Sequence, residues 1–272
     1  GMMQHIIEAR QRENQLAVEA RLKSVQPEID KLISFAKGDT EGTGRPRTMQ
    51  ELRDLIIKAG EKIYMGIPEC LDTFKFVMNK RRYETNEASF HLANGPSLLG
   101  VAEAYFGVQA WLNDIDYAEL EFPKKMARLL QVRGSINTLV ADIRELDTAS
   151  EAAPTRAPSK FRHITMIDLF GGLEYIKSLP HGQLYYNATL TPELYDLKYI
   201  RELKAIVTKE AAVFAREVCE AVLERITDGG DIIMTVDSPL SSISNDVKPI
   251  LQDVAREKGI TLDFDKGYVL TQ

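Results

Sequence analysis

A break in composition at residues 147–162 most constrains how this chain can fold. The segment reads DTASEAAPTRAPSKFR, with two prolines, small residues and charges but no run of large apolar side chains. Proline cannot continue a helix, and a segment of this composition cannot bury one face against a core. The sequence therefore predicts a linker over 147–162, with one domain over 2–146 and a second over 163–272.

The length and composition of the chain agree with two folded domains. The 272 residues exceed the roughly 100 to 200 residues of a common domain. Hydrophobic residues make up 44% and charged residues 27%, as in ordinary folded proteins. The formal net charge of −6 disfavours a protein that coats nucleic acid, because such proteins are basic.

Two absences bear on where the protein works. No apolar stretch reaches the ~18 to 20 residues that span a bilayer, and no signal-peptide core is present at the amino terminus. Cys70 and Cys219 lie in different halves, inside apolar helical patterns, and are predicted to be buried, reduced thiols. We therefore expect a cytoplasmic protein with no membrane contact.

The first half has the periodicity of packed helices. An apolar stripe with alternating spacings of four and three predicts one helix face, the predicted interaction face: Val18, Leu22, Val25, Ile29 and Leu32. This face either packs inside a bundle or pairs with a second chain. Further apolar patterns predict four more helices, over 48–66, 70–82, 98–112 and 123–146. The almost wholly apolar run 98–112 is predicted to be the central, buried helix of the bundle.

The second half mixes predicted helices with predicted strands. A helix over 165–179 competes with a strand over 164–169, and the remaining elements are a strand over 184–190, a helix over 192–226, a strand over 232–236, a helix over 245–258 and a hairpin over 260–271. The fold class predicted for the whole chain is α+β and predominantly helical. A helical bundle is followed by a small α+β unit with a three-stranded antiparallel sheet.

The carboxy-terminal hairpin resembles a known DNA-binding element. Residues 259–270 read GITLDFDKGYVL, with a turn signal at 265–267. This ending is similar to the wing of winged-helix domains, and the resemblance implies DNA binding. The chain departs from that family because Pro249 lies inside the candidate recognition helix, and because Asp253 and Glu257 on that helix repel phosphate.

A cluster of basic residues offers a second route to nucleic acid. Together with one aromatic side chain, the cluster could form a basic face for single-stranded nucleic acid: Arg45, Arg47, Lys80, Arg81, Arg82 and Tyr83. The alternative is a solvated helix end, since Glu84 and Glu87 follow at once. An acidic run over 114–121, interleaved with apolar residues, is predicted to be a connection between two bundle helices.

No motif in the sequence specifies a reaction. The histidines lack metal-ligand spacing, and neither a P-loop, a dinucleotide fingerprint nor a nucleophile elbow is recognised. The sequence accordingly predicts no metal and no cofactor. An enzyme remains an alternative, with a site assembled from scattered residues such as His91, His181 and Asp237.

The function predicted from the sequence is a non-enzymatic interaction, assembly or regulatory protein that acts through amphipathic helices. Its expected partner is a second copy of the chain or another protein, so an oligomer is expected. Nucleic acid is a possible partner that the net charge disfavours.

Overall fold

The computed structural model describes residues 68–95, 97–153, 155–167, 169, 173–235, 247–265 and 268–271, together with isolated positions between 5 and 30. The chain divides into two compact units. The first comprises residues 1–142 and 146–157, and the second comprises 143–145 and 158–272. The predicted interaction face, the predicted helix over 48–66, and the basic residues Arg45 and Arg47 lie outside the described residues.

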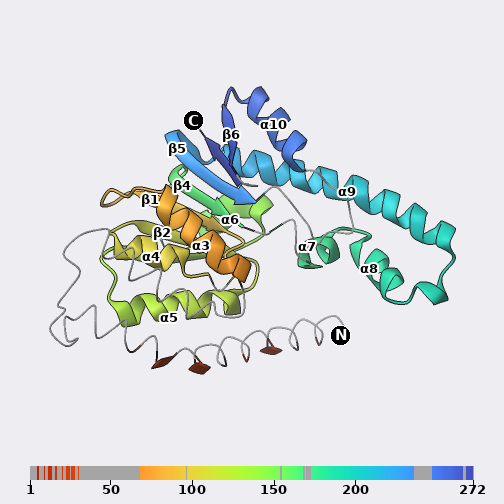
Figure 1. Ribbon diagram of the computed structural model, residues 1–272, viewed down its shortest axis with the longest axis horizontal. Helices are drawn as coiled ribbons and strands as arrows, with labels where there is room; N and C mark the ends of the chain where they lie inside the picture. The colour runs from red at the N-terminus through yellow and green to blue at the C-terminus, as the bar shows by residue number, and fades with distance from the viewer. Residues whose placement is uncertain are drawn as a thin grey trace. The chain divides into compact units, whose positions relative to one another are not determined.

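The first unit alternates strands with helices (Figure 1). Its elements are α3 (Pro68–Lys80), β1 (Ala88–Leu92), α4 (Leu99–Tyr105), β2 (Gln109–Asp114), η1 (Tyr117–Leu120), α5 (Glu121–Leu130), β3 (Ser135–Val140) and α6 (Leu146–Ala152). The strands run parallel in the order β3-β2-β1. A strand, a helix and a second parallel strand, repeated once, make the βαβαβ half of a doubly wound α/β fold.

Strands β1 and β2 of this unit have side chains that are buried on both faces. The four central residues of β2 and the last four of β1 are buried, as in parallel strands covered by helices. Phe90 of β1 lies in register with Trp111 of β2, and Trp111 with Asn137 of β3. On α5, Phe122 and Met126 are fully buried. One amphipathic face of α5 thus covers the unit's core.

Two of the helices predicted in the first half are wrong. Residues 98–112 contain α4 and β2, and residues 123–146 contain most of α5, all of β3 and the start of α6. Gly107 turns the chain between α4 and β2 with φ of +98°, a conformation that favours glycine. A Cβ on Gly134 would lie 1.9 Å from the carbonyl oxygen of Val108, so only glycine fits before β3. These two glycines divide each predicted helix into a helix, a turn and a strand.

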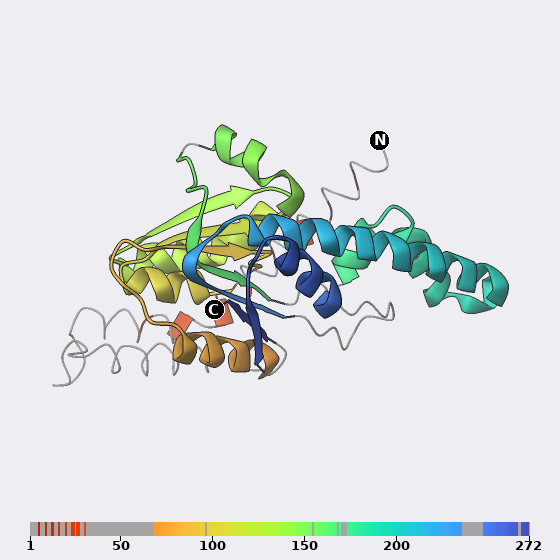
Figure 2. The ribbon, with the colours of Figure 1, turned by 90° about the horizontal axis from the view of Figure 1, so that it is seen from above.

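The second unit combines parallel and antiparallel pairing (Figure 2). Its elements are η2 (Ile143–Glu145), β4 (Phe161–Met166), α7 (Leu173–Ser178), α8 (Gly182–Leu190), η3 (Pro192–Leu194), α9 (Leu197–Leu223), β5 (Ile226–Thr235), α10 (Val247–Glu257), β6 (Leu262–Asp265) and β7 (Tyr268–Thr271). The strand order is β4-β5-β7-β6. Strand β5 pairs in parallel with β4 and antiparallel with β7, and β6 and β7 form the hairpin.

The predicted fold class is therefore wrong. The chain is an α/β protein with five parallel strands, β1 to β3 in the first unit and β4 and β5 in the second. The hairpin β6-β7 is present, but the sheet that it joins is not a three-stranded antiparallel sheet, because β5 also pairs with β4. Residues 184–190 lie in α8 instead of a strand.

Helix α9 is the longest element among the described residues. Asp196 caps its start, where the carboxylate accepts a hydrogen bond from the backbone N–H of Lys198 at 3.1 Å. Its buried face continues over much of its length: Leu203, Val207, Ala211, Phe214, Ala215, Val218, Cys219, Val222 and Leu223. None of the described helices combines the length and the apolar character needed to cross a bilayer.

The segment predicted to be a linker contains regular structure at both ends. Helix α6 extends to Ala152, and β4 begins at Phe161. The boundary between the two compact units within this segment falls between residues 157 and 158 of the chain. A linker between independently folding domains stays a prediction, whereas the helical bundle assigned to 2–146 is replaced by the βαβαβ unit.

Candidate functional site

The carboxyl ends of β1, β2 and β3 lie at one edge of the first unit, because the three strands are parallel. In open α/β sheets, ligands bind outside this edge. The chain leaves β1 into the turn that leads to α4, leaves β2 at Asp114, and leaves β3 at Val140. Polar groups in these three segments form the candidate site.

The turn after β1 holds an acceptor without a donor. Ala93 and Gly95 both have left-handed conformations, with φ of +48° and +55°. The Asn94 side-chain Nδ2 donates to the carbonyl oxygens of Gly95 at 2.6 Å and Ser97 at 3.4 Å, which fixes the orientation of the amide. Its Oδ1 is buried, and none of the described residues donates a hydrogen bond to it. A buried, unsatisfied acceptor is costly and favours a ligand that brings a donor.

Glycine spacing in this turn follows a nucleotide-binding pattern with one change. Gly95, Ser97 and Gly100 occupy the three glycine positions of G-x-G-x-x-G, with serine in the middle. A Cβ on Gly100 would lie 2.5 Å from Cδ2 of Leu112, so this glycine lets α4 pack closely on β2. The first and third glycines thus serve the tight turn and the helix–strand contact, and serine replaces the one that normally admits a diphosphate.

Asp114 ends β2 with its carboxylate turned to the β1–α4 turn. Its Oδ2 accepts from the backbone N–H of Gly95 at 2.8 Å, and its Oδ1 accepts from that of Asp116 at 3.0 Å. Burial raises the pKa of Asp114 above 3.8, against the effect of these backbone donors, which lower it. Asp114 follows Gly95 by 19 residues, close to the ~20-residue offset of the acidic residue that binds a ribose hydroxyl in dinucleotide sites.

An apolar side chain stands beside this carboxylate. Ile115 is 72% exposed, directly after the end of β2. The next residue, Asp116, accepts a hydrogen bond from the backbone N–H of Ala118 at 3.0 Å and so starts η1. This cap fixes the chain on both sides of Ile115. The site therefore offers an apolar contact next to a negative charge.

Asn113 holds the three strand ends together. This side chain is 1% exposed, and its Nδ2 donates to the carbonyl oxygens of Leu139 and Ala141, each at 2.9 Å. Its Oδ1 accepts from the backbone N–H of Ala93 at 3.3 Å. One buried amide of β2 is thereby bonded to the ends of β1 and β3. Such fixed hydrogen bonds keep a site in its binding geometry before the ligand arrives.

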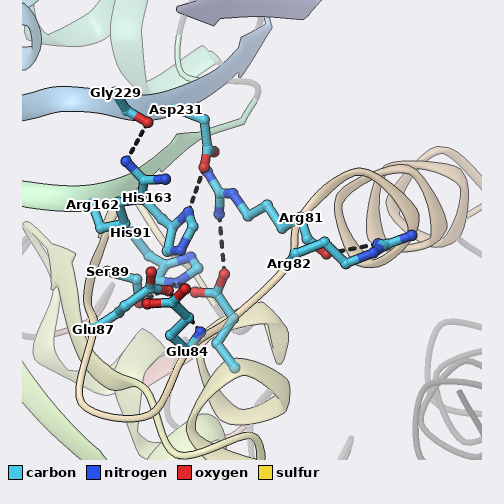
Figure 3. A network of polar contacts seen from close by, with 11 residues as sticks. Arg81, Arg82, Glu84, Glu87, Ser89, His91, Arg162, His163, Gly229 and Asp231 are labelled. Atoms are coloured by element: carbon cyan, nitrogen blue, oxygen red, sulfur yellow. Dashed lines mark hydrogen bonds and ion pairs between the residues drawn. The ribbon is translucent and has the colours of Figure 1, made fainter. Parts of the chain in front are cut away.

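A buried ionic cluster joins β1, α4 and the segment after α3 (Figure 3). Glu103 of α4 is fully buried and contacts Nη1 of Arg81 at 3.2 Å and Nε2 of His91 at 2.5 Å. Arg81 follows α3, and His91 lies in β1, so three segments meet at one carboxylate. Ser89 Oγ lies 3.3 Å from the same His91 nitrogen. A buried carboxylate needs such partners, since an unpaired charge in the interior is strongly destabilising.

This cluster changes the reading of the predicted basic face. Arg81 is 2% exposed and faces Glu103, so it is not available to a nucleic-acid backbone. Arg82 is exposed and donates to the carbonyl oxygens of Asn79 and Arg81, each at 2.9 Å, and Lys80 is exposed. Tyr83 stacks on Phe106 with ring centroids 5.4 Å apart. The described part of the face is therefore a helix end with one buried arginine.

Three of the four histidines each contact a different carboxylate. His91 pairs with Glu103 in the first unit, and His181 of the second unit bonds to Glu210. A third, His163, is 3% exposed and bonds to Asp231. Asp237 lies outside the described residues, which contain no group of three or more potential metal ligands. The candidate site at the ends of β1, β2 and β3 therefore contains other residues than His91, His181 and Asp237, from which an enzymatic site was predicted.

Asn94, Asp114 and Ile115 are not among the site residues predicted from the sequence. The acidic run over 114–121, predicted to connect two bundle helices, is the end of β2 with η1 and the start of α5. A usable signal was present in the glycine spacing after an apolar run, followed by an acidic residue at a fixed distance. The glycine pattern was not recognised because Ser97 occupies its middle glycine position.

Comparison with known proteins gives a likeness of fold at low identity. No family model and no curated protein matches the sequence. A TehB-like SAM-dependent methyltransferase from Corynebacterium glutamicum is 12% identical with a TM-score of 0.41, over 82% of this chain and 92% of that chain. An O-methyltransferase family protein from Burkholderia thailandensis is 12% identical with a TM-score of 0.43, over 95% and 70%. Precorrin 8w decarboxylase from Methanobacterium thermoautotrophicum is 11% identical with a TM-score of 0.43, over 74% and 89%.

The prediction of a non-enzymatic interaction, assembly or regulatory protein is wrong. It relied on several long amphipathic helices, and the one predicted over 123–146 is in fact divided among α5, β3 and α6. It relied equally on the lack of any catalytic constellation, whereas the Asp114 carboxylate accepts from the Gly95 N–H at the strand ends, next to the buried Oδ1 of Asn94 in the sequence.

Proposed function

We propose that this chain is a methyltransferase that binds S-adenosylmethionine at the strand ends of the first unit. The observation that carries the proposal is the Asp114 carboxylate, which accepts from the Gly95 N–H beside the exposed Ile115. A ligand for this site combines hydroxyl donors, a flat apolar ring and positive charge. An adenosyl sulfonium has all three.

The ribose of the ligand fits Asp114. A carboxylate at the end of the second strand is the acceptor that ribose hydroxyls use in related α/β sites. Its backbone donors occupy one lone-pair direction on each oxygen, and an ionised carboxylate offers about four such directions. Two ribose hydroxyls can therefore bond to Asp114 while the turn keeps its hydrogen bonds.

The adenine fits the apolar and polar groups that flank this carboxylate. Ile115 gives a ring an apolar surface to cover, and its exposure of 72% falls when it does so. Asp142 follows β3 at the same edge and is half-buried. Its carboxylate is an acceptor for the exocyclic amino group of adenine.

Charge separates this ligand from a nucleotide with a diphosphate. The Gly95 N–H already donates to Asp114, so a phosphate would lose that donor and face a carboxylate. The Ser97 side chain stands where a glycine would admit the pyrophosphate. By contrast, the buried Oδ1 of Asn94 needs a donor, which the ammonium group of the methionine part supplies.

Bound sulfonium supplies an electrophilic methyl group, and a nucleophile that takes the methyl carbon leaves the carbon–sulfur electron pair on a neutral thioether. The residues of this chain bind and orient. Asp114 holds the ribose, Ile115 the ring, and Asn94 the amino group. We further propose that the protein works in the cytoplasm, where the buried free thiol of Cys219 stays reduced.

Calorimetry with S-adenosylhomocysteine, the product of methyl transfer, tests the proposal directly. We expect binding to the full-length protein and no comparable heat with NAD⁺ or ATP. Asp114→Asn should weaken binding roughly 10- to 100-fold, the effect of losing hydrogen bonds to a charged group. Asp72→Asn, an exposed carboxylate on α3, is the matched control and should change nothing.

Two results would overturn the proposal. One is tight binding of NAD⁺ or ATP with no heat from S-adenosylhomocysteine at millimolar concentration. The other is equal binding by Asp114→Asn and the native protein. Transfer of a labelled methyl group into a cell extract, lost in Asp114→Asn and kept in Asp72→Asn, would extend the result from binding to reaction.

A further inference from the structure

The second unit carries a concentration of exposed apolar side chains on α8, η3 and the first part of α9, residues 182–213, here called the arm. Of the twelve large apolar side chains that are exposed among the described residues, eight lie on the arm: Leu184, Leu190, Leu194, Tyr195, Leu197, Tyr199, Ile206 and Val213. In Figures 1 and 2, α8 lies beside the first half of α9. Apolar exposure gathered in this way marks an interaction surface, whereas single exposed residues do not.

Three of these residues form a straight stripe along α9. Tyr199, Ile206 and Val213 recur every seven residues and are 41%, 43% and 59% exposed. A seven-residue repeat keeps side chains on one side of a helix over two or three turns. The stripe is separate from the buried face of α9, which includes Leu203 and Val207. Helix α9 therefore has two apolar faces, of which one packs inside its own unit.

We propose that the stripe pairs with the same stripe of a second copy of this chain, so that two α9 helices lie antiparallel around a twofold axis at Ile206. The stripe has Ile206 at its centre, with Tyr199 and Val213 seven residues on either side. A twofold axis through the centre places Ile206 against the partner's Ile206, and Tyr199 against the partner's Val213. A large side chain thus meets a small one at both ends, which helps the two surfaces to interlock.

Charged residues beside the stripe favour the same arrangement. Glu202 and Lys209 are exposed and lie on the same side of the stripe, toward the solvent face of α9. In the antiparallel pair, Glu202 of one copy lies beside Lys209 of the other, twice per dimer. A parallel pair would instead place these residues of the two copies on opposite sides of the interface, so the contact between glutamate and lysine would not form. Opposite charges at flanking positions set orientation in paired helices in this way.

The stripe continues beyond the start of α9. Tyr195 stacks on Tyr199 with ring centroids 5.8 Å apart and planes 17° from parallel. Tyrosine is enriched in protein interfaces because it presents large apolar area and loses little conformational freedom.

Sedimentation equilibrium or light scattering of the full-length protein tests the pairing. We expect the native chain to be a dimer at micromolar concentration. Ile206→Glu should raise the dimer dissociation constant roughly 100-fold or more, because two carboxylates would meet at the twofold axis in an apolar contact. Leu197→Glu is the matched control, since Leu197 lies about two and a half turns from Ile206, on the opposite side of α9, and is 66% exposed.

Charge exchange distinguishes a specific pair from general loss of folding. Glu202→Lys alone and Lys209→Glu alone should each weaken the dimer, and the double variant should restore it. Cross-linking gives a second readout. In a Cys70→Ser background, Ile206→Cys should form a disulfide-linked dimer under mild oxidation, and Leu197→Cys should not.

Clear results overturn the proposal. The proposal is overturned if the native chain stays monomeric at about 100 µM. It is also overturned if Leu197→Glu breaks the dimer while Ile206→Glu leaves the dimer intact. The stripe contains no residue of the proposed cofactor site. Binding of S-adenosylhomocysteine and dimerisation can therefore succeed or fail separately.

Discussion

The strand ends of the first unit and the arm of the second unit expose opposite kinds of surface. At the strand ends, an amide oxygen and a carboxylate are drawn into partly buried positions, with Asn94 and Asp114 as examples. On the arm, apolar side chains stand in solvent along α9. Small ligands are recognised by a few fixed polar groups in a largely dry site, and protein partners by an extended apolar surface. The two regions thus carry the two different partners that we propose, a small ligand and a second copy of the chain.

The units also differ in how they use charge. In the first unit, Arg81 and Glu103 form an ion pair in the interior, with exposures of 1% and 0%. In the second, Arg216 and Glu257 form an ion pair on the surface, with Nη2 to Oε2 at 2.6 Å. The hydrogen bond from Arg216 is the main reason that the pKa of Glu257 is lowered. Geometry is good in both pairs, so burial is the variable that separates them.

Removing one member of each ion pair should separate them most sharply. Glu103→Ala leaves Arg81 and His91 buried without their carboxylate, and we expect a loss of about 3–5 kcal/mol in the free energy of unfolding. Arg216→Ala should leave the midpoint of urea unfolding unchanged, because water and salt already screen that pair. Equal losses in the two variants would contradict the role assigned to burial.

A methyl group added to glycine gives the next largest contrast. Gly100→Ala places a Cβ 2.5 Å from the fully buried Leu112 side chain, and overpacking of this kind costs about 1–3 kcal/mol. Gly259→Ala meets open space, and its cost comes only from the φ of +69°. That cost is about 1 kcal/mol. Thermal unfolding of both variants measures the difference, and a more stable Gly100→Ala protein would show that α4 is not closely packed on β2.

The pH dependence of stability tests the environment of Asp114. Because burial raises its pKa in the folded protein, the protonated form is favoured by folding, and that contribution is present below pH 3.8 and lost as the pH rises through the folded value. In the absence of ligand, Asp114→Asn should therefore gain stability relative to the native protein as the pH rises from 3 to 7. Melting temperatures at several pH values give the comparison. A gain at falling pH would mean that the backbone donors outweigh burial.

The smallest effect concerns the thiol of α9. Burial raises the pKa of Cys219 to about 12, so the reactive thiolate is scarce at neutral pH. In a Cys70→Ser variant, a thiol reagent should modify nothing in the native protein and one group per chain in denaturant. Rapid labelling of Cys219 under native conditions would contradict this expectation, because it would show that the buried face of α9 opens to solvent.

The helices that the sequence predicted well have one buried and one exposed face. Helices over 70–82, 192–226 and 245–258 appear as α3, α9 and α10, and the hairpin over 260–271 as β6 and β7. In each helix the apolar residues return every three or four positions because one side meets water. That periodicity is a property of the local sequence, so it can be read before the fold is known.

The elements that the sequence misassigned lack that contrast. Strand β2 is buried on both faces, so the apolar run that begins in α4 continues into it without a change of period and resembles the interior of a helix. The site was missed for a related reason. Asn94 and Asp114 gain their roles when parallel pairing brings two strand ends together, and no local pattern records that meeting.

The backbone conformation of Ala93 lowers the stability of the first unit. It adopts φ of +48° immediately before the Asn94 amide, a conformation that costs an alanine about 1 kcal/mol relative to glycine. Replacing Ala93 with glycine would remove this cost from the folded protein. The melting temperature would then rise by a few degrees, provided that the larger conformational entropy of glycine in the unfolded chain did not offset the gain. The methyl group that remains keeps this turn from sampling other conformations. Alanine at position 93 therefore restricts the conformation of the turn and lowers the thermal stability of the protein.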